Sequence, residues 1–223
     1  MSKAKEWSSF KYKFWNRDSE GAMAWENNQN NLVFSVENRY IKSLLDDKKA
    51  TYLDLACGLG RMTPILQSKN KESVACDFGV GMLEKTRERY GVQCVRADAF
   101  HLPFRDNVFD GTLIIRFIYH FPPSELLFEE LSRVNKKHSV IIFNTLNKYS
   151  LTYFTSKILR LKVWASSRSE VLSLLSFGEY SCECKQMFLL STCFYRVIPK
   201  LIFSFLEKIP LRKCLTYWRI KLA

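Results

Sequence analysis

The run Leu53–Gly60, Leu-Asp-Leu-Ala-Cys-Gly-Leu-Gly, constrains the fold of this chain more than any other segment. An apolar, strand-like stretch ends there in a turn of small residues, and Arg61–Ser68 has the pattern of a helix start. Gly58 and Gly60 permit positive φ and a close approach of the backbone to a ligand. The helix N-terminus supplies unpaired N–H donors. This strand–turn–helix unit is typical of a nucleotide-type binding site.

Strand-like and helix-like segments alternate between residues 30 and 145, which predicts an α/β fold with a parallel sheet and helices on both faces. We expect helices over Leu32–Leu45, Arg61–Ser68, Gly79–Tyr90 and Pro123–Val134. We expect strands over Thr51–Ala56, Ser73–Asp77, Val92–Arg96, Phe109–Phe117 and Ser139–Asn144, with a surface turn at 135–139. After Asn147 we expect a helix over Arg168–Leu175, strands over Tyr180–Phe188 and Leu215–Leu222, and a helical stretch around Tyr195–Leu206.

An acidic residue, Asp77, ends the second expected strand about twenty residues beyond the glycine turn, in Val74-Ala-Cys-Asp-Phe-Gly-Val-Gly-Met-Leu83. An acid at this position can accept hydrogen bonds from both hydroxyls of a ribose. The alternative is an ordinary Asp that caps the following helix.

Two further segments follow in order. Residues 96–110 read Arg-Ala-Asp-Ala-Phe-His-Leu-Pro-Phe-Arg-Asp-Asn-Val-Phe-Asp, and residues 113–121 read Leu-Ile-Ile-Arg-Phe-Ile-Tyr-His-Phe. Together with the glycine turn and the Asp77 segment, these two segments resemble the four motifs of class I S-adenosylmethionine (SAM)-dependent methyltransferases. The four occur in the same order along the chain as in that family. The likeness extends over about two-thirds of the chain and is of the small-molecule and lipid-precursor type, such as the quinone-biosynthesis methyltransferases.

The resemblance implies SAM as cofactor and a Rossmann-like, doubly wound, mostly parallel seven-stranded sheet closed by a C-terminal antiparallel hairpin. By it, Asp77 would bind the ribose, and Asp98 and Ala99 the adenine, which Leu102–Phe104 would enclose. Ala56 stands where the family has its first glycine. The cofactor residues that it implies are Asp54, Ala56, Gly58, Gly60, Asp77, Phe78, Met82, Asp98, Ala99 and Arg116.

Methyl transfer from a sulfonium is an in-line displacement that needs alignment and exclusion of water. An oxygen or carbon acceptor can also need a base. His120 is our candidate for that base, because it follows the fourth strand, where the family places the methyl group; a satisfied or solvent-facing loop histidine is the alternative. Tyr119 and Arg116 are candidates for orienting an acidic substrate.

The net charge of +12 is concentrated at the C-terminal end, where residues 148–223 contain thirteen Lys/Arg and four Glu. An excess of this kind favours an anionic partner: an acidic substrate, a membrane surface or nucleic acid. A solvated basic face is the alternative. No RNA-binding motif accompanies the charge, so RNA or protein methylation rests on charge alone.

We interpret the chain as a single domain with three parts: an N-terminal helical lid (1–49), a SAM-binding core (50–147), and a substrate-side insertion with closing strands (148–223). The aromatic segment Trp7–Trp25 either folds over the site or packs on the edge of the sheet. The apolar stretch Phe188–Leu206 contains Arg196, Pro199 and Lys200, which argues against a membrane span. It is either an interfacial helix or a helix packed on the sheet.

Seven scattered cysteines favour free thiols in a reducing compartment, so we expect a cytoplasmic protein, with peripheral membrane association left open. We expect no metal site, because Cys182 and Cys184 have no matching ligand cluster. A dinucleotide-dependent oxidoreductase is disfavoured, because Arg61 or Thr63 stands where the third small residue of its fingerprint belongs. A SAM-binding protein without transferase activity remains the rival from another class.

Overall fold

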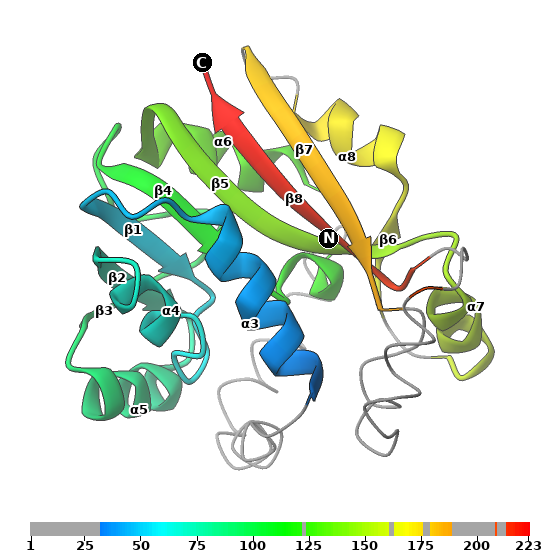
Figure 1. Ribbon diagram of the computed structural model, residues 1–223, viewed down its shortest axis with the longest axis horizontal. Helices are drawn as coiled ribbons and strands as arrows, with labels where there is room; N and C mark the ends of the chain where they lie inside the picture. Colours follow the sequence, from blue (N-terminus) through cyan, green and yellow to red (C-terminus); the bar gives the residue numbers. More distant parts are fainter. Residues whose placement is uncertain (1–31, 122–123, 161–162, 176–178, 189–207, 209–212) are drawn as a thin grey trace, which may run out of the picture.

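One mixed sheet organises the described residues of the computed structural model, which are 32–121, 124–160, 163–175, 179–188, 208 and 213–223 (Figure 1). Its strands are β1 (Ala50–Leu55), β2 (Lys71–Asp77), β3 (Gln93–Arg96), β4 (Phe109–Ile114), β5 (Asn135–Asn147), β6 (Ala165–Ser166), β7 (Tyr180–Met187) and β8 (Leu215–Leu222). Its helices are α3 (Leu32–Leu44), α4 (Thr63–Gln67), α5 (Val80–Tyr90), η1 (Ile118–His120), α6 (Glu125–Val134), α7 (Leu151–Ile158) and α8 (Arg168–Leu174).

The main path of the sheet has the order β3-β2-β1-β4-β5-β8-β7. The first five of these strands are parallel, whereas β8 pairs antiparallel with β5 and with β7. This confirms the predicted Rossmann-like sheet with its closing antiparallel hairpin. The count differs from seven, because the two-residue strand β6 pairs with the end of β5, which brings the described sheet to eight strands.

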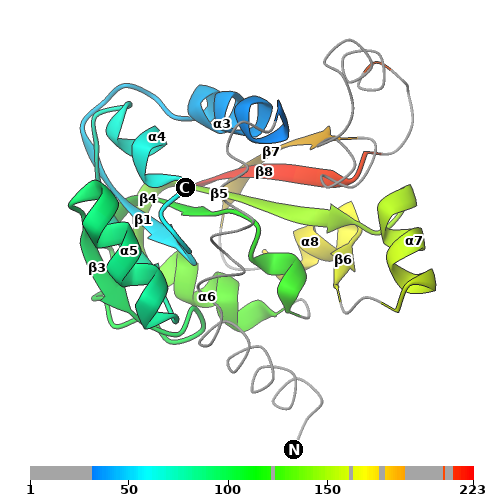
Figure 2. The ribbon, with the colours of Figure 1, turned by 90° about the horizontal axis from the view of Figure 1, so that it is seen from below.

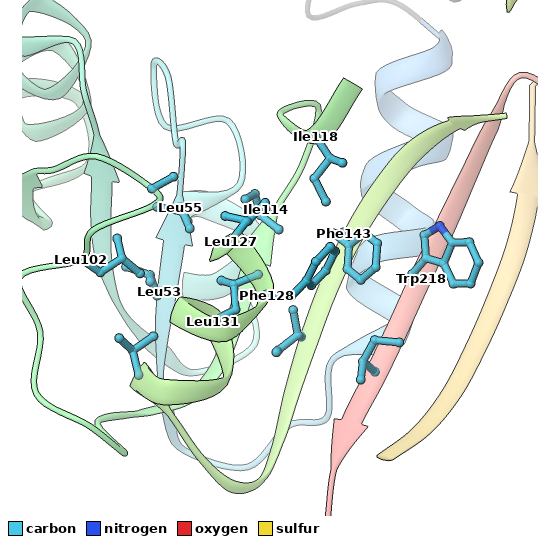
Figure 3. Close-up of a cluster of buried hydrophobic side chains, with 14 of the residues drawn as sticks. Leu53, Leu55, Leu102, Ile114, Ile118, Leu127, Phe128, Leu131, Phe143 and Trp218 are labelled. Carbon is cyan, nitrogen blue, oxygen red and sulfur yellow. The ribbon is translucent and has the colours of Figure 1, made fainter. Parts of the chain in front are cut away.

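Two apolar clusters lie on opposite faces of the sheet, as Figure 2 shows for the helices that cover them. Alternate residues of one strand belong to different clusters: Leu53 packs with α6 and α8, and its neighbour Tyr52 packs with α3 and α4. Figure 3 shows the first cluster, in which Phe128 of α6 meets Phe143 of β5 and Phe143 stacks on Trp218 of β8. Burial on both faces explains why the central strands are almost continuously apolar.

Two segments near the site differ from the prediction. Strand β4 ends at Ile114 rather than at residue 117, because Arg116 has a φ of +64°, which ends the extended backbone. Residues 135–139 are the first part of β5 rather than a surface turn. The buried Asn135 side chain binds the hydroxyl of Thr112 and the carbonyl of Leu131, which holds this segment in the sheet.

The segment after β5 contains α7, which we did not predict. Ser150 caps this helix, since its hydroxyl accepts a hydrogen bond from the N–H of Tyr153. The aromatic segment Trp7–Trp25 and the helical stretch around Tyr195–Leu206 lie outside the described residues. Cys182 and Cys184 alternate with exposed residues along β7 and face the same cluster, as predicted for a strand.

Candidate functional site

The strand order reverses between β1 and β4, and the loops that follow β1, β2, β3 and β4 all leave from the same edge of the sheet (Figure 1). Ligands of open α/β sheets bind outside the carboxyl ends of the strands at such a reversal. The predicted site residues lie at this edge: 54–60 at and after β1, 77–82 after β2, 98–99 after β3, and 116–120 after β4. The structure therefore brings together four segments that are distant in the sequence.

Asp77 connects two of these loops. One carboxylate oxygen accepts a hydrogen bond from the N–H of Gly58 at 2.9 Å, and the other from the N–H of Gly79 at 2.9 Å. Burial raises the pKa of Asp77 above its usual value, although these backbone donors act in the opposite direction. Each carboxylate oxygen has a second lone pair, so Asp77 can still accept hydrogen bonds from a ligand.

The two glycines of the turn meet different surroundings. Both have positive φ, +56° at Gly58 and +78° at Gly60. A Cβ at Gly60 would lie 2.8 Å from side-chain atoms of Thr86 and Tyr90, whereas a Cβ at Gly58 would meet nothing within 4 Å. Gly60 thus allows α5 to pack closely, and Gly58 leaves open space beside the turn. Ala56, at the first glycine position of the family, also has positive φ, +54°.

Asp54 supports the turn from below. Its buried carboxyl accepts a hydrogen bond from the hydroxyl of Thr63 at 3.2 Å. Burial raises the pKa of Asp54 to about 7, and nearby Asp77 acts in the same direction. The Thr86 hydroxyl donates to the carbonyl of Gly58 at 3.0 Å, so both sides of the turn are held by side chains.

The side chains expected around the ribose and adenine differ in burial. Met82 lies in the first turns of α5 and is buried. Phe78 is half-buried, and the Arg96 guanidinium lies 5.1 Å from the centre of its ring. Asp98 accepts a hydrogen bond from the N–H of Phe100 at 3.0 Å, which fixes the backbone beside the buried Ala99.

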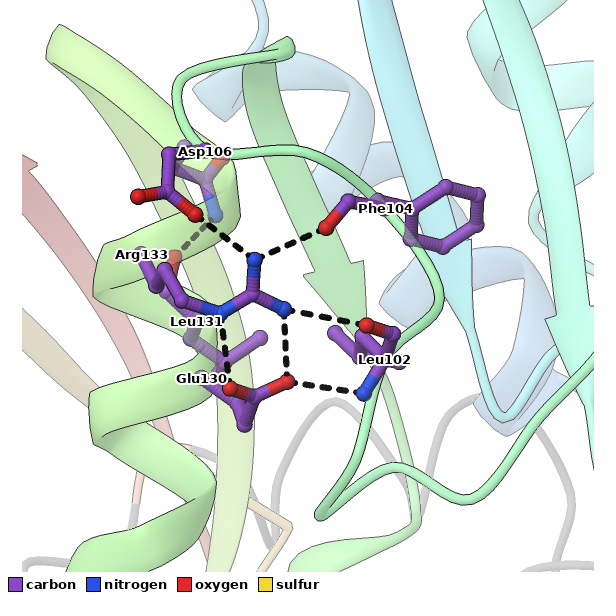
Figure 4. Close-up of polar contacts among 7 residues, drawn as sticks. Leu102, Phe104, Asp106, Glu130, Leu131 and Arg133 are labelled. Atoms are coloured by element: carbon purple, nitrogen blue, oxygen red, sulfur yellow. Dashed lines mark hydrogen bonds and ion pairs between the residues drawn. The ribbon is translucent and has the colours of Figure 1, made fainter.

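A polar clamp on α6 holds the loop of residues 102–106, part of which the family resemblance assigns to the adenine (Figure 4). Arg133 donates to the carbonyl oxygens of Leu102 at 3.0 Å and Phe104 at 2.7 Å. It also contacts the carboxylates of Asp106 at 2.8 Å and Glu130 at 2.8 Å. Glu130 in turn accepts from the N–H of Leu102 at 2.7 Å. These bonds give Glu130 and Arg133 a structural role that we did not predict.

A buried ionic cluster around Glu37 is the main feature that the sequence reasoning missed. The Glu37 carboxylate, with no exposed surface, binds Arg61 at 2.9 Å and Arg116 at 2.9 Å, and accepts a hydrogen bond from Tyr217. Burial alone would raise the pKa of Glu37, but attraction to Arg116 and Arg61 brings it below its usual value. One sequence signal could have revealed this cluster: Glu37 lies four residues from each of Val33 and Ile41, on the same buried side of the helix.

Asn144 completes the inner side of this cluster. Its side-chain oxygen accepts a hydrogen bond from the N–H of Arg116 at 2.7 Å, while its buried amide nitrogen has no hydrogen-bond partner among the described residues. A buried donor without a partner costs roughly 1–3 kcal/mol, so this nitrogen is a candidate for contact with a ligand.

His120 lies in η1, directly after the Arg116 bend. Its N–H donates to the carbonyl of Phe117 at 2.9 Å, and its ring centre is 4.6 Å from that of Tyr119. Desolvation raises the pKa of Tyr119 to about 12, so its phenol is protonated at neutral pH and can donate a hydrogen bond. The carbonyl of Tyr119 accepts from the N–H of Trp164 at 2.9 Å, which ties η1 to the segment after α7.

Known proteins match this core in both sequence and structure. Residues 53–143 match the family described as "Methyltransferase domain". A demethylmenaquinone methyltransferase of Corynebacterium kroppenstedtii is 38% identical over 84 residues, which are 38% of this chain and 36% of the relative. A malonyl-[acyl-carrier protein] O-methyltransferase of Hamiltonella defensa is 29% identical over 121 residues, 54% of this chain and 47% of the relative. The chain thus matches about a third to a half of these relatives' length.

A solved structure extends the likeness beyond the matched core. A SAM-dependent methyltransferase from Thermotoga maritima, described as a possible histamine N-methyltransferase, superposes with a TM-score of 0.69 at 16% identity. The superposition covers 95% of this chain and 99% of that one, which shows the shared fold. Residues 53–143 are therefore similar in sequence to a methyltransferase domain, and the chain shares the fold of a SAM-dependent methyltransferase.

Proposed function

We propose that this protein transfers a methyl group from SAM to a small-molecule or lipid-like acceptor. The observation that carries the proposal is the bond from Gly58 to Asp77, which joins the glycine turn to the acid of β2 at the reversal of the strand order. The names of two relatives, which refer to demethylmenaquinone and malonyl-[acyl-carrier protein], support the class of acceptor.

Each loop has an assigned part in holding SAM. Asp77 accepts from the ribose hydroxyls, and Asp98 with the N–H of Ala99 binds the adenine. Phe78 and Met82 line the ribose and adenine side. Asp54, Ala56, Gly58, Gly60 and Arg116 hold the methionine end, where Gly58 leaves space and the Asn144 amide nitrogen offers a donor.

When bound, SAM supplies an electrophilic methyl group on a sulfonium. The work of this chain is then to align the acceptor and to keep water out. We assign His120 as the base that accepts a proton from an oxygen or carbon acceptor, because η1 follows the end of β4. Tyr119, protonated at neutral pH, is assigned to hydrogen-bond the acceptor.

An anionic acceptor is supported by the net charge of +12, which is concentrated in residues 148–223.

We assign the protein to the cytoplasm, with peripheral contact of its basic C-terminal third with a membrane. Among the described residues, no helix is long and apolar enough to cross a bilayer. The charge of residues 148–223, thirteen Lys/Arg against four Glu, supports attraction to an anionic surface.

Two measurements on the full chain test the activity. SAM and S-adenosylhomocysteine should each raise the melting temperature, because they bind only the folded state. Incubation with SAM and a cell extract should then yield S-adenosylhomocysteine, and mass spectrometry should find a metabolite that is heavier by one CH₂. A thermal shift without turnover would favour the SAM-binding protein that lacks transferase activity, and no shift with either compound would overturn the proposal.

A further inference from the structure

Helix α7 exposes its apolar side and buries the opposite one, the reverse of the usual arrangement for a surface helix. Its inner side carries Ser156, which is 5% exposed, and Tyr153, which packs on the cluster beneath. Its outer side carries Leu151, Phe154 and Ile158, which are 56%, 64% and 66% exposed. Surface helices normally bury the apolar side and expose the polar one. The outer side of α7 is therefore built to contact something other than water.

The exposed apolar residues are concentrated at this place. Among the described residues, seven large apolar side chains are strongly exposed, and five of them lie within residues 149–159. We call these five the α7 patch: Tyr149, Leu151, Phe154, Ile158 and Leu159. Single exposed apolar residues need no explanation, but a contiguous group marks an interaction surface.

The charges beside the α7 patch are basic. Lys157 and Arg160 are exposed on and just after the helix, and the Lys157 ammonium lies 5.1 Å from the ring centre of Tyr153. No acidic residue occurs from 148 to 169. The next acid along the chain, Glu170, forms an ion pair with Lys148. Apolar side chains bordered by Lys and Arg are the pattern of a helix that lies in the interface of an anionic membrane.

The position of α7 relates this surface to the proposed function. The helix follows the carboxyl end of β5, at the edge of the sheet where the site loops leave (Figure 1). The segment after it is bound to η1 by the hydrogen bond from Trp164 to Tyr119. A lipid-like acceptor in the bilayer would thus lie near the segment that contains His120.

We propose that the α7 patch inserts into the surface of a membrane that contains anionic lipids, with Lys157 and Arg160 at the headgroups. The benefit for a lipid-like acceptor rests on the proposed function, whereas the binding to lipid does not. Burial of the apolar side chains provides the free energy of insertion, and the two basic residues provide the preference for anionic lipid.

Flotation of the full-length protein with vesicles tests the proposal. Vesicles of phosphatidylcholine with phosphatidylglycerol should carry the protein, and vesicles of phosphatidylcholine alone should carry much less. The double variant Phe154→Ser/Ile158→Ser should weaken binding about tenfold or more. Lys157→Gln should weaken binding to the anionic vesicles about fivefold, and added salt should reproduce this effect.

The chain offers a matched control. Leu126 on α6 and Leu151 on α7 are each 56% exposed, so Leu126→Ser and Leu151→Ser remove the same side chain at equal exposure. Only Leu151→Ser should lower vesicle binding. Equal binding of the two variants, or no binding of the unchanged protein, would overturn the proposal.

Two other occupants of the patch give different results. If a second copy of the chain covers it, Phe154→Ser/Ile158→Ser will convert a dimer to a monomer in sedimentation. If another part of the same chain covers it, the double variant will lower the melting temperature by several degrees. Either result contradicts membrane docking. The thermal shift with SAM is measured on the same samples, so a loss of vesicle binding with the shift intact leaves the proposed function standing.

Discussion

The carboxylate of Asp77 accepts a hydrogen bond from the backbone N–H of Gly58, 2.9 Å away, across the 19 residues that separate them in sequence. The acid that we assign to the ribose therefore also shapes the glycine turn. Its second oxygen binds the N–H of Gly79 at the start of α5. One side chain thus fixes the two loops between which a nucleoside would lie.

Asp77→Ala should weaken SAM binding by about tenfold to a hundredfold, because a hydrogen bond to a charged group is worth roughly 1.5–3 kcal/mol. Asp77→Asn keeps an acceptor for one backbone donor and should lose less. Isothermal titration with S-adenosylhomocysteine measures both. Asp47→Ala, an exposed acid paired with Lys69, is the control and should leave the affinity unchanged. Unchanged affinity in Asp77→Ala would refute the ribose assignment.

Alanine at the two glycines should separate cofactor binding from folding. Both variants place a side chain at positive φ, which costs about 1 kcal/mol. Gly60→Ala also forces a Cβ against Thr86 and Tyr90, so its melting temperature should fall further. In Gly58→Ala the new methyl group meets no protein atom but occupies the open space beside the turn. For the same fall in melting temperature, this variant should therefore lose more SAM affinity than Gly60→Ala. The opposite order would place the cofactor elsewhere.

Glu37→Gln should strongly destabilise the fold. The variant leaves the guanidinium groups of Arg61 and Arg116 without their shared carboxylate, and loss of one partner of a buried ionic cluster costs roughly 3–5 kcal/mol. Urea unfolding measures the loss. The matched change Glu72→Gln, at an exposed pair with Lys49, should cost less than about 1 kcal/mol. Similar losses in the two variants would mean that the cluster does not stabilise the fold.

The pH dependence of this loss has a definite sign. The pKa of Glu37 is lowered in the folded state, so its contribution is present above the unfolded pKa near 4.5 and disappears as the pH falls below it. The difference in stability between the unchanged protein and Glu37→Gln should therefore shrink on acidification below about pH 4.5.

Arg133→Lys should loosen the loop of residues 102–106, which we assign to the adenine side of the site. A lysine has one compact ammonium and cannot reach the carbonyls of Leu102 and Phe104 together with two carboxylates. We expect a several-fold loss of affinity for S-adenosylhomocysteine. The affinity for adenosine should fall by a similar factor and that for methionine by less, which competition experiments with each compound measure. Arg89→Lys on the outer side of α5 is the control. Equal affinity of both variants would show that the clamp does not affect the cofactor.

The sequence predicted the parallel core well, because each step has a strong local signal. Strands buried on both faces are continuous apolar runs, and the turn at Gly58 and the acid at Asp77 fall at a fixed distance. The antiparallel hairpin was also predicted, and β8 has the predicted bounds, Leu215–Leu222.

The parts that failed depend on contacts between distant residues. The Glu37 cluster joins α3, the residue after the glycine turn, the bend after β4, and β8, and no local sequence pattern indicates a bond between residues 37 and 217. The first part of β5 has a polar sequence, and it is a strand because Asn135 binds Thr112 and Leu131. Helix α7 was missed because it has only eight residues, which is too short for the spacing of Leu151, Phe154 and Ile158 to give a clear helical period.

Asp54→Asn should stabilise the protein, whereas loss of a buried hydrogen-bonding group usually destabilises it. The reason is that burial makes the charged form of the Asp54 carboxyl unfavourable. Burial raises its pKa to about 7 from an ordinary value near 3.8. A raised pKa means that the folded state holds the proton more tightly than the unfolded state, so stability falls as the pH rises from about 4 to about 7. Above pH 7, this pKa shift lowers the free energy of unfolding by roughly 4 kcal/mol.

Asparagine keeps an oxygen that can accept from Thr63 and carries no charge. The variant should therefore gain stability relative to the unchanged protein between pH 4 and pH 8, measured as melting temperature across that range. Asp46→Asn gives the opposite slope: a hydrogen bond to Lys71 lowers the pKa of Asp46, so that contribution is lost as the pH falls. A pH-independent difference for Asp54→Asn would show that its carboxyl ionises normally in the fold.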